Sequence, residues 1–147
     1  MKIAIGSDHA GFDAKEEIKK VIKALGHSFD DVGTTSTTSV DYPDYAEKVA
    51  HQVASGAADF GVLICGTGIG MSIAANKVPG IRAAVVSDEK TAELSRRHND
   101  ANVFCAGARV TPVVKIAESL KVWLQTPFEG GRHAARTAKI KAIESKV

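Results

Sequence analysis

The sequence lacks the features that mark several large classes of protein, beginning with cysteine. Its 147 residues contain two cysteines, Cys65 and Cys105, and no CxxC or HExxH motif. Two cysteines indicate reduced thiols rather than a disulfide framework. Without those ligand spacings, a metal site has no support in the sequence. We therefore expect neither a disulfide-stabilised protein nor a metalloprotein.

Long apolar runs and a large excess of charge are also missing. No window approaches the ~18 consecutive apolar residues of a membrane span, and residues 1–6 resemble neither the apolar core nor the cleavage site of a signal peptide. The formal net charge of +2 is too small to indicate nucleic acid or a membrane surface as a partner. We expect a soluble, cytoplasmic protein that binds neither.

What the sequence contains instead is an alternation of strand and helix patterns along its whole length. Short apolar runs predict strands at about 2–6, 60–65, 81–86 and 103–106, and a weaker signal predicts one at 27–32. Segments with apolar residues at helical spacing lie between them. This alternation indicates a parallel sheet covered on both faces. We expect one domain, 1–147, with an α/β fold: a Rossmann-like three-layer sandwich around a five-stranded parallel sheet.

Local signals predict where the helices begin. Capping-box spacing predicts that two helices begin at Asp13 and Asp44, and Thr111 is the expected N-cap of a third. The last helix, 132–147, follows a glycine break and carries few apolar residues. We therefore expect it to pack on a second subunit instead of on its own core.

The most informative stretch is 62–72, where a buried strand runs into a glycine-rich turn. Cys65 is the last residue of that strand, and Gly66, Gly68 and Gly70 follow at every second position. Such a run lets backbone N–H groups approach a ligand, and the helix N-terminus behind it adds roughly half a positive charge. A thiol that faces this charge is favoured as the thiolate. The stretch predicts a proton-transferring or nucleophilic sulfur beside a cradle for negative charge.

Other uses of such a turn fit less well. The glycines lack the spacing of the dinucleotide fingerprint and no GK[ST] follows, so neither NAD nor ATP is supported. A cysteine phosphatase needs an arginine six positions after its nucleophile, where this chain has Met71. Most free cysteines are simply small buried side chains, and we expect this of Cys105, because no glycine turn follows it.

Polar residues also follow other predicted strands. Because ligands of open α/β sheets bind beyond the carboxyl ends of the strands, Asp8, His9 and Arg109 are candidate site residues. Asp8 would equally well cap a turn. These residues gain weight from occurring together at the same predicted edge.

Three further residues could transfer protons or bind a phosphate group. His98 could give and take protons near pH 7, or simply cap a helix end. Arg132 and Arg136 lie one helical turn apart and would project together, which suits a phosphate group. A solvated basic face would explain the two arginines as well.

Six ordered motifs resemble those of a known family. They are SDHAG at 7–11, DYPD at 41–44, CGTGIG at 65–70, AANK at 74–77, HNDAN at 98–102 and GGRH at 130–133. The chain resembles the type B ribose-5-phosphate isomerases, which belong with the subunits of galactose-6-phosphate isomerase, and the resemblance covers essentially its whole length. It implies a Rossmann-like fold, a homodimer or dimer of dimers, no metal or other cofactor, and interconversion of ribose 5-phosphate with ribulose 5-phosphate.

The resemblance also implies roles in proton transfer. Cys65 matches the base that moves a proton between C1 and C2, and Thr67 matches a residue that assists it. The enediolate would be stabilised by backbone groups of the turn, namely those of Gly66, Gly68, Ile69 and Gly70.

The remaining matches concern ring opening and binding. His98 matches the acid/base that opens the sugar ring, and in the family this histidine and some basic residues come from the neighbouring subunit. The matched substrate contacts are Asp8 and Asn99 to sugar hydroxyls, Tyr42 beside the sugar, His9, Arg132 and Arg136 to the phosphate, and Arg109 as a further basic residue.

Two alternatives stay open. The substrate could be a six-carbon sugar phosphate such as allose or galactose 6-phosphate, because the sequence does not give the distance between the sulfur and the phosphate site. The chain could also be a phosphosugar-binding module without catalysis, although this gives no reason for Cys65 and His98 to occur together.

Overall fold

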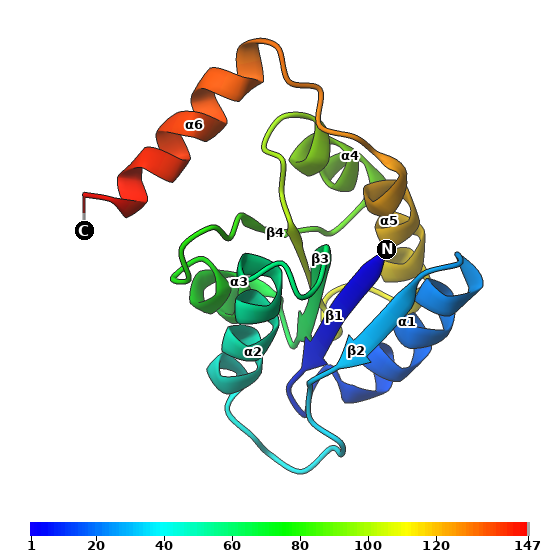
Figure 1. The fold of residues 1–147 in the computed structure, drawn as a ribbon. Helices are drawn as coiled ribbons and strands as arrows, with labels where there is room; N and C mark the ends of the chain where they lie inside the picture. Colours follow the sequence, from blue (N-terminus) through cyan, green and yellow to red (C-terminus); the bar gives the residue numbers. More distant parts are fainter. Residues whose placement is uncertain (147) are drawn as a thin grey trace.

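The computed structural model describes residues 1–146 and contains one five-stranded sheet. Its strands are β1 (Lys2–Ser7), β2 (Ser28–Asp31), β3 (Phe60–Cys65), β4 (Ala83–Val85) and β5 (Val103–Gly107). They lie in the order β2-β1-β3-β5-β4, and each neighbouring pair is parallel (Figure 1). The prediction of a five-stranded parallel sheet is confirmed. β4 is shorter than the predicted 81–86, in part because the Arg82 N–H donates to the Asn102 side chain.

Helices cover both faces of this sheet. They are α1 (Phe12–Ala24), α2 (Tyr42–Ala54), α3 (Ile69–Ala75), α4 (Glu89–Arg97), α5 (Val113–Gln125) and α6 (Arg132–Glu144). Successive side chains of a strand point to opposite faces, so Ile3 and Ile5 share one core with α1, α4 and α5, whereas Ala4 shares the other with α2 and α3. The three-layer sandwich is as predicted, and α6 lies outside the layers (Figure 1).

Trp123 of α5 fills the first of these cores. It is fully buried, and its ring meets Phe60 and Phe104 edge-on at centroid distances of 4.9 and 5.8 Å. Its Nε1–H donates to the Ser95 hydroxyl at 3.1 Å, which satisfies the one polar atom of the indole. This contact joins α5 to α4 and to the sheet.

The predicted helix starts at Asp13, Asp44 and Thr111 are wrong. The N-caps of α1, α2 and α5 are instead Gly11, Asp41 and Pro112. The two aspartates lie inside the first turns, where a carboxylate interacts favourably with the helix dipole without capping the helix. A capping box does exist at α4, where Asp88 Oδ1 accepts the Thr91 N–H at 2.7 Å.

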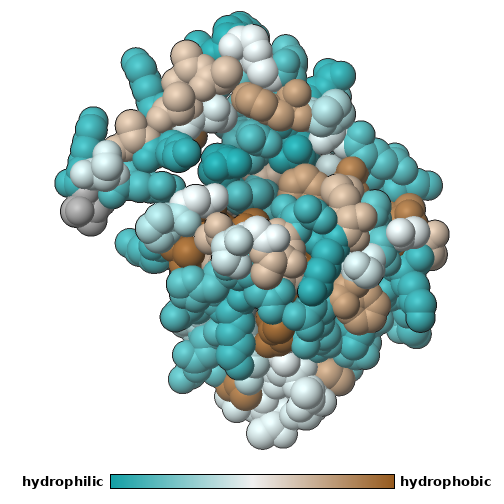
Figure 2. Space-filling model, viewed as in Figure 1, coloured by the Kyte–Doolittle hydropathy of each residue, from teal (hydrophilic) through white to brown (hydrophobic). Residues whose placement is uncertain are grey.

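The last helix stands away from the body as an arm (Figures 1 and 2). Among Arg132–Glu144 only His133 is buried, and Ile140 and Ile143 are 45 % and 56 % exposed. A cavity of about 840 Å³ lies between α6 and the β4 edge of the sheet, lined by residues that include Ile81, Ala84, Ile140 and Ile143. The arm therefore leaves apolar surface uncovered in a single chain. Within residues 1–146, none of the helices has both the length and the apolar character to cross a membrane.

Candidate active site

Cys65 lies at the carboxyl end of β3, in contact with the glycine turn. It is 5 % exposed, and its Sγ accepts the N–H of Gly68 at 3.1 Å. Gly68 has φ +82°, and a Cβ there would lie 2.9 Å from the carbonyl carbon of Ala106. The turn is thus pressed against the end of β5, and only glycine fits this position. The sulfur and the backbone donors are neighbours, as predicted.

Two side chains close over the same turn. The Arg109 guanidinium lies over Gly66, with Nη1 3.5 Å from where a Cβ would be, and the Tyr42 ring lies against Gly70, with Cε1 2.5 Å from where a Cβ would be. The Arg109 N–H also donates to the Gly66 carbonyl at 3.0 Å. The absence of a side chain at Gly70 is what lets the Tyr42 ring approach the loop, whereas a Cβ at Gly66 would make only ordinary contact with Arg109.

Asp8 and His9 lie beside this loop because β1 pairs with β3. Ser7 is in register with Ile64, so the residues after the two strands leave the sheet together. Asp8 is 6 % exposed, and its Oδ1 accepts the Gly11 N–H at 3.1 Å, so it does cap a turn. His9 Nδ1 accepts the Val40 N–H at 3.1 Å, and the neutral ring therefore carries its own proton on Nε2.

His98, Asn99, Arg132 and Arg136 belong to the opposite end of the sheet. His98 is the C-cap of α4 and precedes β5, whose first residue, Val103, pairs with Gly61 at the start of β3. Cys65 lies four residues further along β3, which is about 13 Å at the usual rise of a strand. Within one chain, the predicted site residues therefore form two groups, one at each end of the strands.

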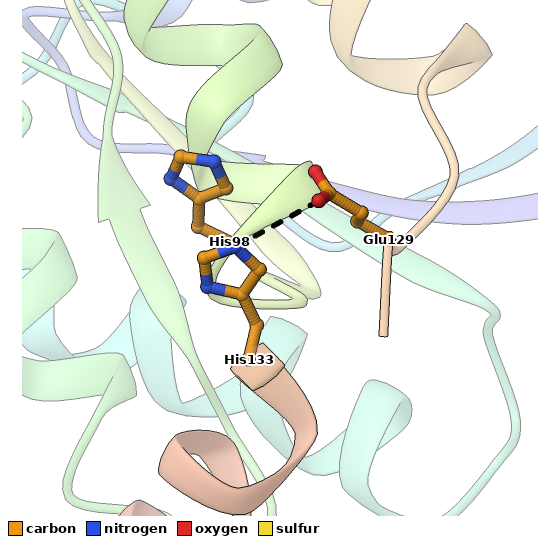
Figure 3. Close-up of side chains that lie close together, drawn as sticks. All are labelled: His98, Glu129 and His133. Atoms are coloured by element: carbon orange, nitrogen blue, oxygen red, sulfur yellow. Dashed lines mark ion pairs between the residues drawn. The ribbon is translucent and has the colours of Figure 1, made fainter. Parts of the chain in front are cut away.

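The second group is built around two stacked histidines (Figure 3). The rings of His98 and His133 lie 4.2 Å apart between centroids, with an interplanar angle of 16°. Glu129 approaches His133 Nε2 at 3.9 Å, and a donor atom from each of the three residues lies within 4.8 Å of the others. Nearly parallel rings do not direct their in-plane lone pairs at one ion at ~2 Å. The stack as it stands is therefore not a metal centre.

The comparisons with known proteins concern almost the entire chain. A family model described as Ribose/Galactose Isomerase matches residues 3–140. The chain belongs to this family. It is 49 % identical over 145 residues to ribose-5-phosphate isomerase B of Escherichia coli, which covers 99 % of this chain and 97 % of the relative.

Solved structures of this ribose/galactose isomerase family have the same fold. A ribose-5-phosphate isomerase B from Clostridium thermocellum matches with a TM-score of 0.98 and 52 % identity over 99 % of both chains. A ribose-5-phosphate isomerase B from Mycoplasma genitalium with bound ribulose-5-phosphate matches with a TM-score of 0.95 and 40 % identity, over 99 % of this chain and 97 % of that one.

Sequence reasoning missed two supporting residues in this member of the family. His133 lies in the GGRH motif, but its stack on His98 depends on where α6 sits. Lys15 is 1 % exposed, and its ammonium donates to Asp31 Oδ2 at 2.6 Å and to the Thr34 carbonyl at 2.8 Å. A lysine three positions before Ile18 on the apolar face of a helix was the available signal.

Lys15 and His9 fix the two ends of the loop that leads to Tyr42. Lys15 holds residues 31–34, and His9 holds Val40. The residues between, 35–39, are exposed. The wall of the site formed by Tyr42 is thus attached to β1 and α1 at both ends of the loop.

Proposed function

We propose that the protein interconverts D-ribose 5-phosphate and D-ribulose 5-phosphate through an enediolate. The observation that carries the proposal is the Cys65 sulfur seated against the N–H of Gly68 at the end of β3. The chain's relatives support the choice of sugar, since one is ribose-5-phosphate isomerase B of Escherichia coli and another holds ribulose-5-phosphate.

In this mechanism the residues at the carboxyl end of β3 carry out the proton transfer. Cys65 takes a proton from C2 of the open-chain aldose and returns it to C1, with Thr67 assisting. The N–H groups of the turn from Gly66 to Gly70 stabilise the negative oxygen of the enediolate, since donors fixed in advance favour a charge that develops there. A base that is held close to the reacting carbons gains most of its effect from position.

Phosphate and hydroxyl contacts hold the sugar in place. His9 presents its Nε2–H, and Arg109 its guanidinium, beside the turn. Arg132 and Arg136 are exposed on α6 and free to bind phosphate in pairs. Binding energy from the phosphate is then available to orient C1 and C2 against the sulfur.

Two copies of the chain are needed in this proposal. His98 opens the ring, yet it lies at the opposite end of the strands from Cys65 of its own chain. A second copy supplies it, with Asn99 and the arginines of α6. Such a copy would cover two apolar surfaces. One is formed by Ile69 and Ile73 beside the Cys65 turn, whose side chains are 55 % and 58 % exposed. The other is the cavity between α6 and the β4 edge of the sheet.

The first test is NMR of the protein with ribose 5-phosphate in D2O, with allose 6-phosphate in a parallel tube. We expect ribulose 5-phosphate to appear in the first tube and to contain deuterium at C1. Cys65→Ala should remove conversion by orders of magnitude and leave substrate binding. The matched control is Cys105→Ala, because Cys105 is fully buried and burial raises the pKa of its thiol. Binding of both sugars without conversion would leave only a binding module.

A mixing experiment tests the shared site. Cys65→Ala homodimers should be inactive on ribose 5-phosphate, and His98→Asn homodimers should retain only the slow reaction of sugar that is already open. When equal amounts are mixed, half of the population is heterodimer and each heterodimer has one intact site. Activity should therefore recover to about a quarter of the wild-type value. No recovery after verified subunit exchange would mean that each chain works alone.

A further inference from the structure

The attachment of α6 to the body runs through one buried side chain. His133 is 5 % exposed, whereas no other residue of Arg132–Glu144 is buried. Gly130 and Gly131 directly before the helix have φ +70° and +53°, values that glycine adopts at little cost. At the far end, Glu144 accepts the Gly80 N–H at 2.7 Å. The first turn of α6 is thus held by His133 and, just before the helix, by the Glu129 N–H, which donates to the Arg97 carbonyl at 3.1 Å.

His133 contacts the ring of His98. The two imidazoles are stacked at 4.2 Å, and His133 Nε2 is buried and has no hydrogen-bond partner among residues 1–146. A buried polar atom without a partner costs free energy, so the stack is maintained at some expense. His98 itself has one face covered by His133 and is only partly buried.

The charge state of His133 suits this arrangement. Burial, followed by the neighbouring His98 and Arg132, lowers the pKa of His133, and Glu129 opposes them without reversing the shift. His133 is therefore neutral at pH 7. A neutral ring does not repel a proton on His98, which must carry one during ring opening.

We propose that His133 is a positioning residue that orients His98 for ring opening and ties it to the helix that carries Arg132 and Arg136. This inference rests on the function proposed above. Through the stack, an anion held by the two arginines fixes the first turn of α6, and that turn fixes His98. The arginines that bind the phosphate and the histidine that opens the ring are thereby parts of one rigid unit.

The experiment compares a sugar that must be opened with one that cannot close. Ribose 5-phosphate that lacks its 4-hydroxyl cannot form a furanose, and its phosphorylated O5 prevents a pyranose. For His133→Ala we expect kcat on ribose 5-phosphate to fall about ten- to a hundredfold, a share of the usual gain from acid–base catalysis. On the 4-deoxy sugar it should change less than about threefold. His133→Phe, which keeps a flat ring in the stack, should restore most of the loss.

A second comparison isolates the partner of His133. In a His98→Asn background, His133→Ala should add no further loss on ribose 5-phosphate, since residues that act through one another are not additive. His51→Ala is the matched control, because His51 is exposed on α2 and, among residues 1–146, its side chain pairs only with Glu47 at 3.5 Å. It should match the wild type on both sugars.

Three results would overturn the inference. An equal fall of kcat on both sugars would make His133 a purely structural anchor. A raised KM with unchanged kcat would make it a substrate ligand, and additive losses in the double variant would separate it from His98. A wild-type protein that converts neither sugar would instead refute the proposed function, and the inference with it.

Discussion

Lys15→Met is the substitution whose cost can be worked out most directly from the structure. The Lys15 ammonium makes two charge-assisted hydrogen bonds, to Asp31 at 2.6 Å and to the Thr34 carbonyl at 2.8 Å. Such bonds contribute roughly 1.5–3 kcal/mol each. Two effects reduce the loss: methionine is easier to bury than an ammonium, and Lys19 still donates to Asp31 at 2.9 Å. We expect the free energy of unfolding to fall by about 2 kcal/mol.

Thermal unfolding gives the first measurement. For a chain of this length, a loss of about 2 kcal/mol lowers Tm by about 6 °C. Lys20→Met is the control, because Lys20 is 73 % exposed and pairs with Glu17 on the surface, where an ion pair contributes little. Amide exchange at Thr34 gives a local measurement, since its N–H donates to the Ser7 carbonyl at 3.1 Å and should exchange faster in the variant.

The pH dependence of the same variant adds a sign. Burial opposes ionisation of Asp31, but hydrogen bonds from Lys15, Lys19 and the Gly33 N–H outweigh it and lower its pKa. The stabilisation from Asp31 is therefore complete above a pH of about 4 and is lost as the pH falls through the lowered value. Lys15→Met should weaken this acid dependence. An unchanged Tm and an unchanged acid limb would refute the account of Lys15.

Two further substitutions test the packing. Gly11→Ala places a Cβ against the carbonyl of Ile64 at the end of β3, so it should destabilise the protein by about 1–3 kcal/mol and disturb Cys65. In the control, Gly26→Ala, the new Cβ meets no atom, and the variant reports only the cost of φ +87°. Equal losses of stability and activity in the two variants would contradict this expectation. Trp123→Phe removes the hydrogen bond to Ser95 and should cost about 1–3 kcal/mol in urea unfolding, which a variant with the wild-type midpoint would disprove.

The sheet could be predicted from the sequence because its signal is local. Every strand except β2, whose sequence is SFDD, is a short apolar run, and the helical segments between them force parallel pairing. Helix starts were harder, because Asp13 and Asp44 are as favourable in the first turn as at the cap. At the start of α1, the N-cap is Gly11, which packs closely against Ile64 of β3. A contact between such distant segments has no local signal in the sequence.

The candidate site divides in the same way. Asp8, Cys65 and Arg109 were expected at one end of the sheet because each lies at or just after the carboxyl end of a parallel strand, and the structure brings them there. The stack of His98 on His133 and the pairing of Lys15 with Thr34 depend on where an arm and a loop come to rest. Neither placement is encoded in spacing.

The strand order has a consequence for how the candidate site can change. The chain leaves β1 toward α1, on one face of the sheet, and leaves β3 toward α3, on the other face. In open α/β sheets, ligands bind where adjacent strands send their connections to opposite faces, so the place of this site follows from topology and requires no void in the core. The loop residues that follow β1 and β3 can therefore vary in size and charge while both cores stay filled. A fold of this kind can accommodate ligands of different length when loop residues are exchanged, at little cost to folding.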